Sequence, residues 1–577
     1  MPQSSVLSML HGRASLRPND VAFTFTDYDR DPAGIREALT WSQLSRRTFN
    51  VARELGFHGS VGDRALILAP QSLDYIAAFL GAMQAGLIAV PLPLPHRGSS
   101  HERVSAVLTD TSPSVVLTTS AVAQEVAEYV DAARLISVPK IVEIDSLNLD
   151  AIGETVLPTI DFPKTAYLQY SSGSTRLPAG VMISHTNLQT NFEQLMRGFF
   201  ADAKVPSDAT IVSWLPFYHD MGLVLGVCAP ILGGYRGELT SPVAFLEKPA
   251  RWIRTLAQNP QSFSAAPNFA FDLAARKTTD ADLAGCDLGE VLGIISGAER
   301  VEPTTLQRFV DRFAHFNLRD QVMRPSYGLA EATVFVAAGT WDEMSPAGYF
   351  DADELSAGRV RRCGAATGTA LIRYRVPHSP RVLIVDGDTR RPCPPGVVGE
   401  IWVHGSNVAE GYWNKPAAEQ QCFGAAPDAP DAGVPAEGWL RTGDQGFIDR
   451  GELFIVGRIK DLLIIRGRNH YPEDIEATIQ QITPGRVAAI AVPVADTEKL
   501  VAVVEVKLRD GRSDEDLQRL DRIKSDVTSA ISTTHGVNVG DLVLVAPGSI
   551  PTTTSGKIQR AACLEQYRRD QFIRVDS

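Results

Sequence analysis

Short apolar runs alternate with amphipathic segments from about residue 40 to residue 327. Residues 64–70 form a continuous apolar run typical of a buried strand, and residues 41–55 place apolar side chains on one helical face behind Thr40, a suitable N-cap. This alternation predicts a large N-terminal layered α/β domain with a largely parallel sheet. The predicted strands are 64–70, 90–94, 114–119, 210–215, 262–266, 291–296 and 323–327, and the predicted helices include 41–55, 74–85 and 102–109.

The pattern changes near residue 380. Residues 382–386, 399–403 and 452–456 are short apolar runs separated by turn residues, which predicts a small β-rich subdomain at about 380–456. Between them, residues 424–438 are rich in Ala, Pro, Asp and Gly and are expected to form an exposed loop.

A last unit, 457–577, has the pattern of a compact α+β domain. Residues 489–494 and 500–508 read as two strands joined by a turn at 495–499, and 541–545 reads as a third. Between the second and third strands, a 3-3-4-4 spacing predicts an amphipathic helix packed on this sheet, with Leu517, Leu520, Ile523, Val527 and Ile531 on its apolar face.

Composition excludes several classes of protein. The chain has 577 residues, enough for two to four domains, and a net charge of −12, which argues against a nucleic-acid surface. Its six cysteines form no C-x-x-C pair and no His-Glu-x-x-His occurs, so neither a disulfide framework nor a zinc site is indicated. Residues 1–20 lack an export signal. These features predict a cytoplasmic protein with buried thiols.

One apolar stretch, residues 75–95, approaches the length of a membrane span. It contains Gln84 and ends in the alternating prolines Pro91, Pro93 and Pro95. A buried helix followed by a short strand explains this composition better than a membrane-spanning helix. We therefore expect no integral membrane segment.

Hydroxyl and glycine residues are concentrated between an apolar run at 165–170 and a second segment that begins at Val181. Small residues let the backbone approach a ligand, and successive N–H groups and hydroxyls can surround a phosphate. A flexible Ser/Gly linker is the alternative, but linkers are rarely bounded by apolar strands. The Lys that a Walker loop requires is absent here, and Gly556-Lys557 is followed by Ile558. We predict a phosphate loop of another kind, formed by Ser171, Ser172, Gly173, Ser174 and Thr175.

Further motifs follow in a fixed order. They are 214–222 (WLPFYHDMG), 326–332 (SYGLAEA), 440–444 (LRTGD), 457–461 (GRIKD) and 551–560 (PTTTSGKIQR). In this order, with the loop at 170–181, they resemble the core motifs of the adenylate-forming (acyl-activating) superfamily. The segments 213–224, 325–333 and 341–374 are similar to those of the actinobacterial fatty-acid–AMP ligases.

The resemblance implies an adenylation domain at 1–456, carrying a family insertion at about 341–374, and a mobile C-terminal domain at 457–577 that rotates about Lys460. It also implies a reaction in which ATP and a fatty acid give an acyl-adenylate and pyrophosphate. The acyl group is then handed to the acyl-carrier-protein domain of a polyketide synthase. A peripheral association with the membrane through that synthase is compatible with this role.

The resemblance also implies a nucleotide site. Tyr327 would lie against the adenine, with Gly328 allowing close approach and Gly297, Ala298 and Glu299 forming the opposite wall. Asp444 would bind the ribose, since one carboxylate can accept hydrogen bonds from both hydroxyls, and Arg458 would reach the same sugar. For Tyr327 a buried core tyrosine, and for Asp444 an ordinary turn residue, are the alternative readings.

Catalytic roles follow from the same resemblance. Glu331 would coordinate Mg²⁺ with Thr175 as hydroxyl partner, and Lys557 would bridge the substrate carboxylate and the α-phosphate. His219, in a sequence with the aromatic residues Trp214, Phe217 and Tyr218, would orient the carboxylate or gate the acyl channel. A helix-start Glu, a core His and a solvated Lys are the respective alternatives.

The sequence departs from the superfamily pattern at the phosphate site, and it favours one class of acid substrate. Many members of the superfamily have Lys where this chain has Ala179, so the cation that meets pyrophosphate is open; Arg176 is one candidate. The segment 263–269 has no acidic residue to meet a substrate amine, which favours an aliphatic acid. Its apolar channel is expected to involve Phe263, Phe269, Phe271 and the run 221–232.

Two other functions stay open. A long-chain acyl-CoA ligase would differ only in its acceptor, and an insertion packed between the domains would obstruct the CoA-dependent geometry. A non-catalytic nucleotide- or lipid-binding module of the same fold is supported only by the Lys missing at position 179. The retained Glu331, Asp444, Arg458 and Lys557 argue against it.

Overall fold

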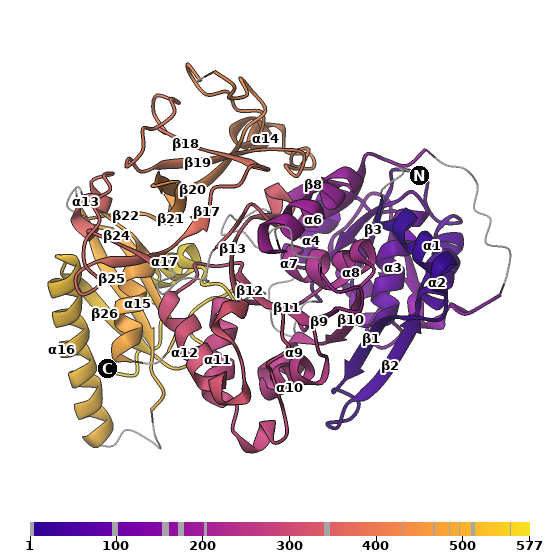
Figure 1. The fold of residues 1–577 in the computed structure, drawn as a ribbon, viewed down its shortest axis with the longest axis horizontal. Helices are drawn as coiled ribbons and strands as arrows, with labels where there is room; N and C mark the ends of the chain where they lie inside the picture. Colours follow the sequence, from indigo (N-terminus) through magenta and orange to yellow (C-terminus); the bar gives the residue numbers. More distant parts are fainter. Residues whose placement is uncertain are drawn as a thin grey trace.

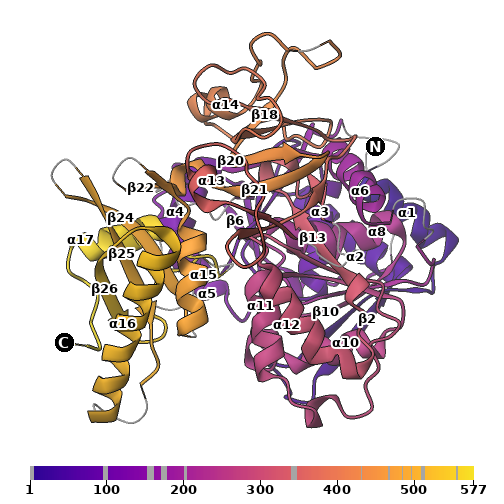
Figure 2. The same ribbon diagram turned by 60° about the vertical axis from the view of Figure 1, so that its left-hand side comes forward.

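The computed structural model describes residues 5–576 apart from 95–101, 153–160, 171–177, 201–204, 340–346, 431, 466–467, 484, 495–496, 509–513 and 554–555. Figures 1 and 2 show the N-terminal α/β layers on one side and α15, α16 and β24–β26 grouped on the other. A sheet containing β18–β20 lies above both in these views. The predicted α/β fold with a β-rich part and a small C-terminal α+β part is confirmed.

The N-terminal part contains two sheets. The eight-stranded sheet has the order β14 (Ala337–Ala338), β13 (Met323–Tyr327), β12 (Gly293–Gly297), β11 (Ser262–Pro267), β9 (Thr210–Ser213), β10 (Arg236–Thr240), β1 (Val21–Asp27) and β2 (Ile35–Thr40). The six-stranded sheet has the order β6 (Lys140–Glu143), β5 (Val115–Thr118), β3 (Arg64–Ile67), β4 (Ile88–Pro91), β7 (Thr165–Tyr170) and β8 (Gly180–Ser184). Inner pairs are parallel, and β1/β2, β13/β14 and β7/β8 are antiparallel. The largely parallel character is confirmed, but it is divided between two sheets.

Helices cover these sheets. They are α1 (Val6–Leu16), α2 (Trp41–Leu55), α3 (Leu73–Gln84), α4 (Glu102–Thr111), α5 (Ala123–Ala132), α6 (His185–Phe200), α7 (Asp220–Leu223), α8 (Ala229–Gly233), α9 (Pro242–Glu247), α10 (Ala250–Gln258), α11 (Asn268–Lys277) and α12 (Pro303–Phe313). Thr40 caps α2 as predicted, in a reciprocal box with Gln43. In α3, a Cβ at Gly81 would lie 2.5 Å from Val51 of α2, so a glycine is needed for these helices to approach.

The apolar stretch at 75–95 has the predicted form. Helix α3 is buried almost throughout, Gln84 included, and the chain then enters β4. The helices among the described residues are all too short or too polar to cross a bilayer.

The β-rich part is a five-stranded antiparallel sheet in the order β17 (Tyr374–Arg375), β21 (Glu452–Arg458), β20 (Leu440–Asp449), β19 (Gly399–His404) and β18 (Arg381–Val385). The three predicted strands here are confirmed, and β20 was not predicted. Helix α14 (Pro416–Cys422) precedes the largely exposed loop at 424–438.

The described part of the predicted insertion, 347–374, forms a hairpin on this sheet. Strand β15 (Ala347–Phe350) pairs with β16 (Thr369–Ile372), and the short helix α13 (Ala352–Ser356) lies between them. Phe350 and Leu355 pack in one cluster with Phe454 of β21 and with Tyr471, which directly precedes the first C-terminal helix. The segment therefore contacts both the β-rich sheet and the C-terminal unit.

The C-terminal unit pairs β24 (Val487–Val494) antiparallel with β25 (Thr497–Glu505), and β25 parallel with β26 (Val539–Val545). The hairpin β22 (Leu463–Ile465)/β23 (Arg468–His470) and the helices α15 (Pro472–Ile482), α16 (Asp514–His535) and α17 (Arg560–Arg568) complete it. Leu520, Ile523, Val527 and Ile531 of α16 are buried as predicted. The prediction for Leu517 is wrong, because this residue lies in the first turn of α16 and is 44% exposed. The boundary at 456/457 and the mobility of this unit stay predictions.

Candidate active site

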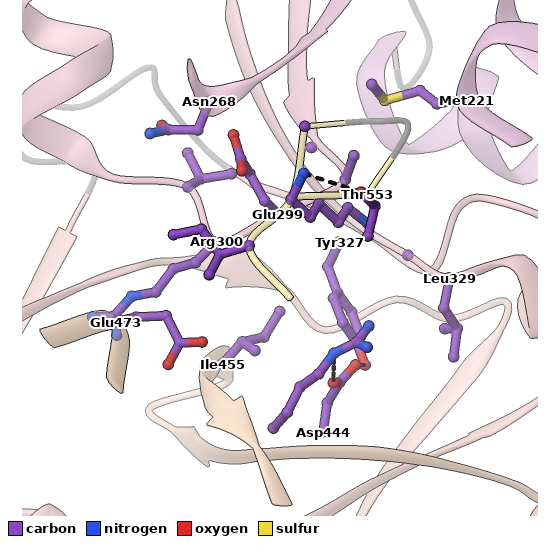
Figure 3. A pocket seen from close by; sticks show the side chains of 18 of the residues that line it. Met221, Asn268, Glu299, Arg300, Tyr327, Leu329, Asp444, Ile455, Glu473 and Thr553 are labelled. Carbon is purple, nitrogen blue, oxygen red and sulfur yellow. Dashed lines mark hydrogen bonds and ion pairs between the residues drawn. The ribbon is translucent and has the colours of Figure 1, made fainter. Parts of the chain in front are cut away.

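A cavity of about 1470 Å³ lies where the three parts of the fold meet. Its walls come from the ends of β7, β12 and β13, from the start of α11, from β20 and β21, and from residues 553 and 556–560 of the C-terminal unit. Figure 3 shows Glu299, Tyr327, Asp444 and Thr553 converging on it from these separate elements. Residues from six of the motifs found in the sequence therefore share one site.

Lys557 enters this cavity from the C-terminal unit. Two hydrogen bonds join Thr553 and Lys557. The Lys557 N–H donates to Thr553 Oγ1 (3.1 Å), and the Thr553 N–H donates to Lys557 O (2.7 Å). Burial, with the neighbouring charge of Arg458, lowers the pKa of Lys557, while Asp220, Glu299 and Asp444 oppose this shift. The ammonium group is thus placed among carboxylates from three different elements.

Asp444 is buried, and both of its carboxylate oxygens have partners. Its Oδ2 accepts a hydrogen bond from the Tyr327 hydroxyl (2.8 Å), and its Oδ1 lies 3.2 Å from Nε of Arg458. Asp444 and Arg458 face each other across β20 and β21, so sheet register brings them together. The predicted adenine and ribose residues Tyr327, Asp444 and Arg458 therefore form one connected group.

The predicted second wall lies along the same cavity. Gly297 ends β12, and Ala298 and Glu299 follow it as lining residues. Burial raises the pKa of Glu299, and its Oε1 accepts a hydrogen bond from the Phe269 N–H (2.8 Å). Gly328 also lines the cavity, and a Cβ there would lie 1.7 Å from Val334 O. A glycine is thus required at 328 by the protein's own backbone.

His219 faces the cavity at the start of α7. Its Nδ1 lies 2.7 Å from Asp220 Oδ1, which also accepts from the Met221 N–H (2.7 Å). Burial raises the pKa of Asp220, but His219, Lys557 and the Met221 N–H outweigh it and lower the pKa. The carboxylate therefore stays ionised and holds the His219 ring at the cavity wall.

The aromatic surroundings predicted for His219 are partly wrong. Tyr218 lines the cavity, but Trp214 stacks on Phe245 in the core, with ring centroids 3.8 Å apart, and Phe217 is buried against Tyr75. These two rings therefore stabilise the core and do not surround His219.

The predicted acyl channel needs a similar correction. Phe269 lines the cavity, whereas Phe271 is fully buried and Phe263 packs against Phe200. Of the run 221–232, Met221 and Leu225 reach the cavity. Other apolar lining residues are Leu195, Leu246, Leu273, Ile295 and Phe335.

Glu331 lies in the cavity wall with a partner that sequence reasoning missed. The Tyr412 hydroxyl donates to Glu331 Oε1 (2.7 Å) from a segment between β19 and α14. In the described part of the chain, no three His, Cys, Asp or Glu side chains cluster as a metal site would require. A single oriented carboxylate fits Mg²⁺, which takes one or two protein carboxylates and completes its shell with phosphate oxygens and water.

The predicted phosphate loop, Ser171, Ser172, Gly173, Ser174 and Thr175, lies outside the described residues, as does Arg176. The residues on either side, Tyr170 and Ala179, both line the cavity. Lys460 also lines it, in the single 3-10 turn Ile459–Asp461 that follows β21.

Arg103 is a cation of this cavity that sequence reasoning missed. Arg103 of α4 lines the cavity near the Tyr218 hydroxyl, and burial lowers its pKa. Tyr218 is in turn tied to β7, because Gln169 Nε2 donates to Tyr218 O (2.9 Å). Arg103 thus shares the cavity with Tyr170, the last residue of β7, after which the predicted phosphate loop begins. No local pattern distinguishes it from a surface arginine of α4.

Comparisons with known proteins agree with this geometry. A family model described as AMP-binding enzyme matches residues 10–413, and one described as the AMP domain of Disco-interacting protein 2-like proteins matches residues 460–575. The chain therefore belongs to the AMP-binding enzyme family.

Within that family its relatives are fatty-acid ligases. It is 62% identical to the putative fatty-acid–CoA ligase FadD21 of Mycobacterium tuberculosis and 57% identical to the long-chain-fatty-acid–AMP ligase FadD28 of the same species, each over 100% of both chains. A solved structure of a fatty acyl-adenylate ligase from L. pneumophila, in complex with acyl adenylate and pyrophosphate, is similar with a TM-score of 0.74 and 32% identity. That match covers 100% of this chain and 97% of the other.

Proposed function

We propose that this protein activates a long-chain fatty acid with ATP, giving an acyl-adenylate and pyrophosphate, and passes the acyl group to the carrier-protein domain of a polyketide synthase. The observation that carries the first step is Lys557, delivered from the C-terminal unit into a cavity that also contains Tyr327, Asp444 and Arg458. The apolar lining of the cavity and the fatty-acid ligases among the relatives support the acyl substrate.

In the proposed step, a carboxylate oxygen forms a bond to the α-phosphorus, the bond from that phosphorus to the bridging oxygen breaks, and pyrophosphate leaves. Both reactants are anions, so the ammonium of Lys557 lowers the barrier by stabilising the charge that develops between them. His219, held by Asp220, orients the carboxylate, and Asp444 with Arg458 holds the ribose. Glu331 with Thr175 would hold Mg²⁺, which would neutralise part of the phosphate charge.

We assign Arg103 as the cation that takes the place of the Lys missing at Ala179. Arg103→Ala is expected to raise the KM for ATP and for pyrophosphate about tenfold, because a charge-assisted contact to phosphate is lost. ATP–pyrophosphate exchange measures both constants. Lys415→Ala is the matched comparison, since Lys415 is a second cation that lines the same cavity, where it pairs with Asp110 (3.1 Å). A larger effect from Lys415 than from Arg103 would reverse the assignment.

An acyl-CoA ligase is the second candidate, because FadD21 carries that putative name. The packing of Phe350 and Leu355 against Tyr471 supports the AMP ligase, since a segment in this position restricts the C-terminal unit from taking the arrangement that admits CoA.

Excising residues 352–360 tests this choice. The Asp351 N–H donates to Arg361 O (2.9 Å), so a Gly-Gly turn can join these residues without disturbing β15. We expect adenylate formation to persist and acyl-CoA formation to rise at least several-fold, because Leu355 and the Asp353–Arg468 ion pair (3.5 Å) are removed. Leu355→Ala is the milder companion variant. Unchanged CoA use in both variants would count against an obstructing role for the segment.

The function itself is tested by incubating the protein with ATP, Mg²⁺ and a panel of fatty acids, with and without CoA, and identifying products by mass spectrometry. Acyl-AMP that accumulates and is not converted by CoA supports the proposal and justifies testing carrier domains as acceptors. Rapid acyl-CoA formation selects the second candidate. If no acid gave an adenylate, the remaining hypothesis would be a non-catalytic nucleotide- or lipid-binding module.

A further inference from the structure

An ion pair links the wall of the nucleotide cavity to the C-terminal unit. Arg300 follows Glu299 directly, and its Nη2 lies 2.6 Å from Oδ1 of Asp474 in the first turn of α15. Arg300 Nε is also 3.2 Å from Glu302 Oε1. The side chains of Arg300 and Asp474 are only 18% and 16% exposed, so solvent screens this pair weakly.

A second group of charges lies on the other side of the same helix turn. Arg560, three residues after Lys557, contacts Glu473 (2.9 Å), Glu476 (2.7 Å) and Asp461 (3.2 Å). Glu473 and Asp474 are adjacent in α15, and Figure 3 shows Arg300 beside Glu473. The first turn of α15 is therefore held by Arg300 from the large unit and by Arg560 from the segment that carries Lys557.

These two groups differ in what they connect. The contacts of Arg560 are all with residues 461–476, on the same side of the predicted boundary as Lys557. The Arg300–Asp474 pair crosses that boundary. Burial lowers the pKa of Arg300, but Asp474, Glu302 and Glu473 together outweigh burial and raise it. These carboxylates therefore stabilise the charged guanidinium in its buried position.

We propose that Arg300 is a positioning residue for adenylation, which acts through Asp474, α15 and Arg560 to hold Lys557 in the cavity. This rests on the proposed function, since it concerns how that function's lysine is placed. Arg300 stabilises the arrangement in which Lys557 faces the nucleotide, and the pair must separate whenever the C-terminal unit moves away. Sequence motifs give no sign of it, because 300 and 474 are 174 positions apart.

A double-mutant cycle tests this mechanism. Arg300→Gln and Asp474→Asn are each expected to lower the rate of ATP–pyrophosphate exchange about 10- to 100-fold, because either change breaks the largely buried ion pair that crosses the boundary. In a Lys557→Ala background the same changes are expected to alter the residual rate by less than about twofold, since Arg300 acts through Lys557. Binding of ATP, measured by calorimetry, should stay unchanged, because Asp444, Arg458 and Tyr327 are intact.

Controls separate positioning from general damage. The exchanged pair Arg300→Asp/Asp474→Arg should recover part of the lost activity. Arg312→Gln, which removes a more exposed ion pair with Asp280 (2.8 Å) away from the cavity, should have no effect. Thermal unfolding checks that each variant is folded. Full activity in Arg300→Gln, or equal losses with and without Lys557, would overturn the inference. A wild-type protein that forms no adenylate would instead refute the proposed function.

Discussion

Lys557→Ala is expected to lower the rate of acyl-adenylate formation by about 10²- to 10³-fold, the usual cost of losing one preorganised donor to a developing charge. The negative charges of Asp220, Glu299 and Asp444 favour the ammonium form of Lys557 inside the cavity. Burial and the positive charge of Arg458 act in the opposite direction, and the net effect is a pKa below the ordinary value. A quenched assay that measures acyl-AMP at saturating ATP and fatty acid reports the effect on the chemical step.

The control for Lys557→Ala is Lys507→Ala. Lys507 is an exposed lysine of the same C-terminal unit, so this substitution should leave the rate unchanged. The pH profile gives a second readout. Because the pKa of Lys557 is lowered, kcat/KM of the wild type should fall as the pH rises through that pKa, where the amine becomes neutral. Lys557→Arg should lose this fall. Adenylate formation that survives Lys557→Ala unchanged would refute the role assigned to this residue.

Asp444→Asn is expected to lower kcat/KM for ATP about 10- to 100-fold, which corresponds to about 1.5–3 kcal/mol for a hydrogen bond to a charged group. Asparagine keeps the size of the side chain but removes the charge that faces Arg458 Nε at 3.2 Å, and it has one acceptor oxygen where the carboxylate has two. The loss should appear in the KM for ATP more than in the KM for the fatty acid, because the acyl chain does not meet this residue in the proposed site.

Asp449→Asn provides the matched control. Asp449 lies on the same strand, β20, and also pairs with an arginine, Arg362, at 2.6 Å, but it is not among the residues that line the cavity. Asp449→Asn should change the free energy of unfolding slightly and leave the KM for ATP unchanged. Equal effects from both substitutions would indicate damage to β20 and would remove the evidence for a ribose contact at Asp444.

Part of this site could be predicted because several of its residues stand in short ordered motifs. Glu331, Asp444, Arg458 and Lys557 were singled out in this way, and all four line one cavity. Arg103, Arg300 and Tyr412 could not be found, since each is a common residue type in an ordinary local context. Their positions in the site depend on packing between segments 81 or more residues apart.

The errors have the same origin. Trp214, Phe217 and Phe271 are aromatic residues near the site in sequence, and their composition alone gives no direction for the side chains. Trp214 stacks on Phe245, and Phe271 packs against Phe309 with ring centroids 5.0 Å apart, so both rings stabilise the core. Leu517 satisfies the helical spacing of α16, but it lies in the first turn of that helix and its side chain is exposed.

The sequence by itself determined the local structure: the capped helix 41–55, the strand 323–327, the hairpin β24/β25 and the order of the motifs that indicate chemistry on ATP. These follow from side-chain periodicity and capping, which act over a few residues. Only the tertiary structure decided that the parallel strands form two sheets, that Asp444 is held by Tyr327 and Arg458, and that Lys557 meets carboxylates from distant elements. Those contacts join residues far apart in the chain, and packing of the elements, not local pattern, sets which side chains converge.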